Sequence, residues 1–140
     1  MTYSFDGFFA RPAIRRPASI PLKVNWRQIV TPFVGIGLRL PDSDDGFDDR
    51  PPPAIIQNLA REFGLNKADS WIYLNYICWG GRIDSVYGLG ACHGIPFGPV
   101  AESDGDQVER AYVSLMTQFG VSADNALHFE PFIRGFWDDE

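Results

Sequence analysis

Two segments of the chain repeat apolar residues at the spacing of one helix face. The first is 54–63, which follows a run of three prolines and precedes Gly64. Proline suits the first turn of a helix because its missing N–H would be unpaired there, and glycine suits the left-handed residue after the last turn. The second is 104–119, which begins with polar residues suited to an N-cap and ends before Gly120. The sequence therefore predicts two amphipathic helices that each end at a glycine.

Five other segments have the residue types or the alternation of strands: 3–10, 28–40, 70–79, 82–91 and 126–137. In 70–79 both faces are largely apolar, which indicates a central strand or one whose second face is covered. Two glycines follow it and suit a tight hairpin. These elements predict an α+β fold, in which a mainly antiparallel sheet of about five strands carries two helices on one face.

The residues that follow the two predicted helices resemble each other. Residues 63–74 and 119–129 both read Phe-Gly-aliphatic-polar, then Ala-Asp-polar, and then a strand-like segment. We interpret this likeness as a tandem ββα duplication within a single domain, 1–140, with halves 1–69 and 70–140 and a C-terminal strand. Chance similarity over about a dozen positions is the alternative.

With both helices on one face, segment 70–79 would present an aromatic face to solvent. That face would hold Trp71, Tyr73, Asn75, Ile77 and Trp79. Exposed aromatic patches usually mark an interface, and we expect this one to serve a homodimer or another protein partner. Alternatively, the Arg- and Pro-rich segment 14–24 covers it.

Composition and charge narrow the function classes. The 140 residues are 45% hydrophobic, which suits one globular domain, and no apolar run approaches the roughly 20 residues that span a bilayer. The chain lacks a classical secretion signal and has only two cysteines, so we expect a cytoplasmic protein that needs no disulfide. Residues 1–40 hold six cations and one anion, whereas 41–140 hold six cations and 17 anions. Because such an acidic surface repels phosphates, we expect neither nucleic acid nor membrane as a partner.

The negative charge is concentrated in two loops. One holds Asp42, Asp44, Asp45, Asp48 and Asp49, and the other is the cluster 102–109 before the second helix. The first loop is not an EF-hand, because its glycine comes one position early and its twelfth residue is proline. We expect these carboxylates to steer a basic protein partner, with Tyr73 and Trp79 as aromatic anchors, as in a non-enzymatic, immunity-type protein that neutralises its target. A surface that only confers solubility is the alternative.

Candidate catalytic chemistry is sparse in this sequence. Cys92 and His93 are neighbours, but adjacent side chains of an extended segment point to opposite sides, so the histidine is badly placed to activate the thiol. Asp84 lies near aromatic residues and could serve as an acid or base. We assign no catalytic residue and favour a protein that is not an enzyme. The alternative is a small enzyme or small-molecule-binding protein with a cleft near Cys92, His93 and Asp84.

Metal and phosphate motifs are not evident either. The cysteines and histidines are Cys78, Cys92, His93 and His128. They lack the short paired spacing of a zinc site. The glycine pairs within 35–37 and 88–90 lack the rest of a dinucleotide fingerprint or a P-loop. We therefore expect no metal and no cofactor, and we interpret these glycines as marks of a bulge or of close contact with a helix.

Overall fold

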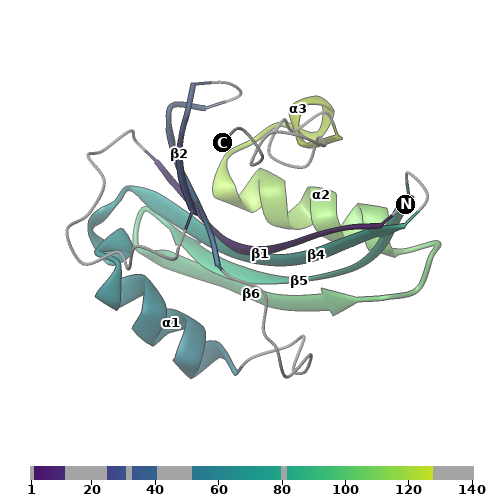
Figure 1. The fold of residues 1–140 in the computed structure, drawn as a ribbon, viewed down its shortest axis with the longest axis horizontal. Coiled ribbons are helices and arrows are strands. Elements are labelled where there is room, and N and C mark those ends of the chain that lie inside the picture. The colour runs from purple at the N-terminus through teal and green to yellow at the C-terminus, as the bar shows by residue number, and fades with distance from the viewer. Residues whose placement is uncertain (1, 12–24, 31–32, 41–51, 80–81, 128–140) are drawn as a thin grey trace.

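The computed structural model describes residues 2–11, 25–30, 33–40, 52–79 and 82–127. Within these ranges, six strands form one antiparallel sheet (Figure 1). In chain order the strands are β1 (Thr2–Arg11), β2 (Asn25–Ile29), β3 (Gly35–Arg39), β4 (Ser70–Trp79), β5 (Arg82–Cys92) and β6 (Ile95–Glu102). Their order across the sheet is β2-β3-β1-β4-β5-β6. The predicted α+β class and the antiparallel sheet are confirmed.

The helices in the described ranges are α1 (Pro53–Glu62), α2 (Val108–Phe119) and α3 (Ala123–Leu127), and a 3-10 turn, η1 (Leu65–Lys67), follows α1. Both predicted helix ends are confirmed, because Gly64 and Gly120 have left-handed φ angles of 77° and 112°. α2 begins four residues later than expected. A turn precedes it, in which the Asp104 carbonyl oxygen accepts hydrogen bonds from the N–H groups of Gln107 and Val108. None of these helices is long and apolar enough to cross a membrane.

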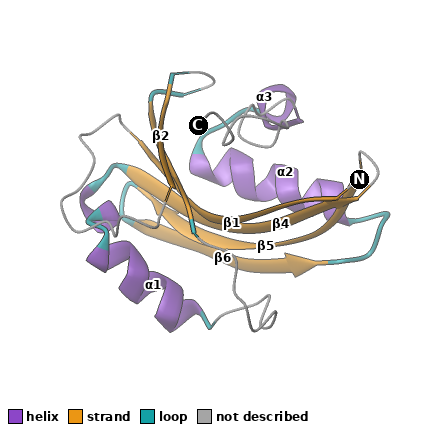
Figure 2. Ribbon diagram, in the orientation of Figure 1, coloured by secondary structure: helices purple, strands orange, loops and turns teal. Residues whose placement is uncertain are grey.

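The two long helices lie on opposite faces of the sheet, and not on one face as expected (Figure 2). The side chains of β4 explain this arrangement. Ile72, Leu74 and Tyr76 pack in the core that contains α2, whereas Trp71 and Tyr73 pack in the core that contains α1. Neighbouring side chains of a strand point to opposite faces, so a strand that is apolar on both faces needs cover on both. Each helix supplies one of the two covers.

The aromatic face of β4 is buried under α1. Phe8 of β1 lies at its centre, with ring contacts to Tyr73 at 5.3 Å, to Trp71 at 6.0 Å and to Phe63 at 5.7 Å. Trp71 and Tyr73 are only 8% and 1% exposed. The prediction of an exposed aromatic face is therefore wrong for Trp71 and Tyr73, which cannot contribute to a homodimer interface there, while Asn75 and Ile77 are half-buried. Segment 14–24, the alternative cover, lies outside the described residues.

The second core lies between the sheet and α2. Tyr112 of α2 is buried there, and its hydroxyl donates a hydrogen bond of 2.6 Å to the carbonyl oxygen of Ala126, which connects α2 to α3. Its ring meets that of Tyr76 edge-on at 5.4 Å. Burial, with a further contribution from Tyr76, raises the pKa of Tyr112 above its usual value.

Two glycines in β5 are required by close packing, as predicted. A Cβ at Gly88 would lie 2.8 Å from the carbonyl oxygen of Tyr73 and 3.0 Å from a methyl carbon of Leu115. The pairing of β5 with β6 also shifts register between Gly88 and Gly90. The structural interpretation of this glycine pair is therefore confirmed at both points, the helix contact and the bulge.

The internal duplication is not confirmed. From the middle of the sheet outward, the first half of the chain runs β1, β3, β2, whereas the second half runs β4, β5, β6. The expected strand 28–40 is replaced by the separate strands β2 and β3, and β6 was not expected. Of the expected strand 126–137, residues 126–127 belong to α3 and the remainder lies outside the described residues.

Candidate functional site

A row of three polar side chains crosses one end of the sheet. Arg11 of β1 pairs with Ser70 of β4, and Ser70 pairs in turn with Cys92 of β5. Ser70 is only 2% exposed, and its hydroxyl donates a hydrogen bond of 3.3 Å to the sulfur of Cys92, which is half-buried. The register of β1, β4 and β5 thus brings together a guanidinium, a hydroxyl and a thiol from residues 11, 70 and 92.

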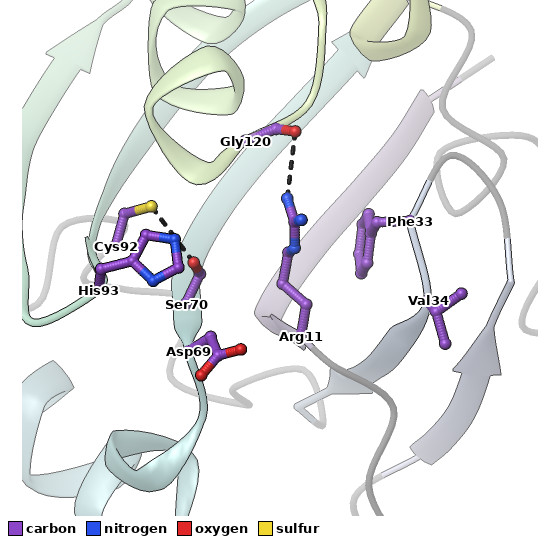
Figure 3. Close-up of a pocket in the computed structure, with 8 residues that line it drawn as sticks. All are labelled: Arg11, Phe33, Val34, Asp69, Ser70, Cys92, His93 and Gly120. Carbon is purple, nitrogen blue, oxygen red and sulfur yellow. Dashed lines mark hydrogen bonds between the residues drawn. The ribbon is translucent and has the colours of Figure 1, made fainter.

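This row forms part of a pocket with a volume of about 510 Å³ (Figure 3). Asp69 and His93 continue the row beyond the ends of β4 and β5. Phe33 and Val34, which precede β3, and Gly120, which follows α2, complete the lining. The pocket therefore combines charged, polar and apolar groups from the ends of five elements, and its volume lies in the range of small-molecule sites.

The local backbone explains why Cys92 and His93 both line this pocket. His93 has a left-handed φ of 51°, which is uncommon for a residue other than glycine. Its N–H donates a hydrogen bond of 2.7 Å to the carbonyl oxygen of Asp69. The expectation that the two side chains point to opposite sides is wrong, because the chain leaves the extended conformation at His93. The hydrogen-bond donor to the thiol is Ser70.

Arg11 connects the sheet to the C-terminal end of α2. Its Nη1 donates hydrogen bonds to the carbonyl oxygens of Gly120 at 3.1 Å and Phe119 at 3.5 Å. The guanidinium also lies 6.0 Å from the centre of the Phe119 ring. A cation at a helix C-terminus is electrostatically favourable, because the last carbonyl groups carry partial negative charge.

Asp84 does not belong to this pocket. It is an exposed residue near the start of β5, whereas Cys92 ends the same strand. Eight residues of a strand span roughly 26 Å, so the two lie at opposite ends of the sheet. The structure therefore brings together only two of the three residues that the sequence grouped in a cleft.

The predicted partner-binding residues have different positions in the fold. Asp42, Asp44, Asp45, Asp48 and Asp49 lie outside the described residues. Trp79 ends β4 beside Arg82, and its side chain also lies outside the described part. Tyr73 is buried, and its hydroxyl donates a hydrogen bond of 2.5 Å to Asp6. Burial, reinforced by the negative charge of Asp6, raises the pKa of Tyr73 above its usual value. Tyr73 is a core residue and is not accessible as an anchor.

The other predicted acidic cluster lies at the end of the sheet opposite the pocket. This cluster, 102–109, lies beside Asp84, which was not predicted to belong to it; we call the group of Asp84, Glu102, Asp104, Asp106 and Glu109 the acidic end. Glu102 pairs with Val86, so Asp84 lies two residues further along β5 toward the same end. All of these residues are exposed except Glu102, which is half-buried.

Hydrogen bonds within the acidic end shape its loop. A Glu102 carboxylate oxygen accepts from the Asp104 N–H at 3.2 Å, and an Asp104 carboxylate oxygen accepts from the Asp106 N–H at 3.0 Å. These bonds order the connection from β6 to α2. Among the described residues, the carboxylates of Asp106 and Glu109 accept no such hydrogen bond, and both residues are exposed.

Comparison with known proteins finds no match, since no family model fits the chain and no curated protein sequence or solved structure is similar to it. Among the described residues, no group of three or more His, Cys, Asp or Glu side chains is placed to hold a metal ion.

Proposed function

We propose that this protein is a non-enzymatic binding protein whose acidic end contacts a basic protein partner, as an immunity-type protein contacts its target. The observation that carries the proposal is the gathering of exposed carboxylates from β5 and from the β6–α2 connection at one end of the sheet. Charges grouped in this way attract an oppositely charged surface and accelerate its encounter with the protein.

The overall charge of the chain supports this proposal. The formal net charge is −6, and segment 42–49 of the sequence adds five aspartates to the carboxylates of the acidic end. We propose that this loop contributes to the same electrostatic attraction. The free thiols of Cys78 and Cys92 are consistent with the reducing cytoplasm as the compartment in which the protein works.

An aromatic anchor is the second part of the proposal. Binding energy at protein interfaces is concentrated in a few residues, in which tryptophan is enriched. Trp79 is the remaining candidate. It is the last residue of β4 and pairs with Arg82, the first residue of β5, so it lies at the same end of the sheet as Asp84. Tyr73, the other predicted anchor, is excluded by its burial.

The test is affinity capture from a native lysate with matched charge variants. The test variant is Asp106→Asn with Glu109→Gln, and the control is Glu62→Gln with Asp124→Asn, which removes the same number of charges elsewhere. We expect the wild type and the control to retain one or more basic proteins at low salt, and the test variant to retain much less. High salt should release these proteins, because exposed charges are screened beyond about 10 Å at 0.1 M.

Two outcomes would reject the proposal. The first is that the wild type retains no basic protein at low salt. The second is that the test variant and the control retain the same protein equally, because the position of the charges would then not matter.

A further inference from the structure

The pocket carries two opposite charges that come from separate elements. Arg11 ends β1, and Asp69 precedes β4; both line the cavity (Figure 3). In the described part of the chain, Arg11 donates through Nη1 to two carbonyl oxygens, and Asp69 accepts a hydrogen bond through its backbone carbonyl oxygen. The guanidinium retains further N–H donors, and the Asp69 carboxylate is exposed, so both charges are available to a ligand.

An apolar wall stands beside these charges. Val34 is 54% exposed, and Phe33 contributes to the same lining while its ring packs edge-on against Phe119 at 5.1 Å. This aromatic contact places the Phe33 ring against the C-terminal end of α2. An exposed valine beside a buried ring offers contact to an apolar substituent of a ligand.

We propose that this pocket binds a small zwitterion, namely a free amino acid or short peptide with an apolar side chain. The ligand carboxylate would bind the Arg11 guanidinium, its ammonium group would bind the Asp69 carboxylate, and its side chain would contact Phe33 and Val34. A simple anion would be repelled by Asp69 and a simple cation by Arg11, so a ligand with both charges suits the lining best. This inference is independent of the partner surface, which lies at the other end of the sheet.

The experiment measures binding of four probes by isothermal titration calorimetry. L-leucine and L-leucyl-L-leucine carry both charges at two different separations, whereas N-acetyl-L-leucine lacks the ammonium group and L-leucinamide lacks the carboxylate. We expect at least one of the two zwitterions to bind with a millimolar or lower Kd. Each capped analogue of leucine should bind roughly tenfold more weakly than the better zwitterion, because it loses one charge-assisted hydrogen bond.

Protein variants assign the ammonium contact to its residue. Asp69→Asn should weaken the zwitterion by roughly tenfold but should not weaken N-acetyl-L-leucine, because that probe has no ammonium group to lose and its carboxylate is repelled by Asp69. Glu62→Gln in α1, outside the pocket, should leave all four affinities unchanged. The amide probe tests the carboxylate contact without changing Arg11, whose replacement also disturbs the connection to α2.

Alkylation of cysteine locates the ligand independently. Cys92 lines the pocket and Cys78 does not, and both are free and half-buried. A bound zwitterion should slow the reaction of Cys92 with iodoacetamide and leave that of Cys78 unchanged. The proposal is overturned if neither zwitterion binds at millimolar concentration, if the capped analogues bind as tightly as the zwitterions, or if Cys92 is not protected.

Discussion

Replacement of Arg11 by methionine tests whether this side chain fastens the sheet to α2. Methionine keeps an unbranched apolar stem but removes the two hydrogen bonds to the carbonyl oxygens of Phe119 and Gly120 and the charge beside the Phe119 ring. The fold should survive, since both cores lack this side chain. We expect a loss of stability without a loss of structure.

The magnitude follows from the contacts. A hydrogen bond from a charged group contributes about 1.5–3 kcal/mol when protected from water, a cation at a helix C-terminus about 0.3–1 kcal/mol, and a cation–π contact at an exposed site about 0.5–1 kcal/mol. The three effects share one charge and the site is partly open to solvent, so they do not add fully. We therefore expect the free energy of unfolding to fall by about 2 kcal/mol, which lowers Tm by roughly 6 °C in a chain of this size.

Urea unfolding followed by tryptophan fluorescence measures this change, since the chain has four tryptophans. The slope of the unfolding free energy against urea should stay constant while the midpoint falls. Arg110→Met is the control, because Arg110 is an exposed residue in the first turn of α2 and its loss should change stability by less than about 0.5 kcal/mol. Equal, small effects of both substitutions would refute the role assigned to Arg11.

Three further predictions concern packing, titration and the thiols. Gly88→Ala should lower the free energy of unfolding by about 2 kcal/mol, because its Cβ meets a carbonyl oxygen of β4 and a leucine methyl of α2; Gly64→Asn, at a left-handed position with open space, should cost less than about 1 kcal/mol by the same urea assay. Because the pKa of Tyr112 is raised in the folded protein, only the unfolded chain ionises this group just above pH 10. The free energy of unfolding of the wild type should therefore fall there by about 1.4 kcal/mol per pH unit more than that of Tyr112→Phe. Equal slopes of unfolding free energy against pH for the two proteins would contradict this. Cys78 and Cys92 should both react with a thiol reagent in the unfolded protein without a reductant, and fewer than two reactive thiols per chain would show that our account of free cysteines is wrong.

The local elements were largely predictable from the sequence because their signals are local. The prolines before 54–63 correctly indicate where α1 begins, and the glycines after both helices correctly indicate where α1 and α2 end. The apolar density of β4 correctly indicates that both of its faces are covered. The error lay in placing both helices on one face, since periodicity shows that a helix has an apolar face but does not show which side of a sheet it packs on.

The pocket was only partly predictable because it depends on non-local pairing. The sequence indicates that Cys92 and His93 are reactive residue types. It does not indicate the left-handed backbone at His93, because such a conformation is usually predicted from a glycine or asparagine at the position itself. Arg11 and Ser70 join them through the register of β1, β4 and β5, which alternation alone does not set. The aromatic residues of 70–79 suggested an interface. The sequence alone does not show that Phe8 of β1 packs against Tyr73 and that this face therefore belongs to the core.

The central claim is that charge at the acidic end drives association with a basic partner. The most direct test is the association rate constant of the captured partner, measured by surface plasmon resonance across a range of salt concentrations. For the wild type and for Glu62→Gln with Asp124→Asn, the rate should be high at low salt and fall steeply as salt rises. For Asp106→Asn with Glu109→Gln, the rate at low salt should be several-fold lower and its dependence on salt weaker. Equal rates and equal salt dependence for both double variants would contradict the claim.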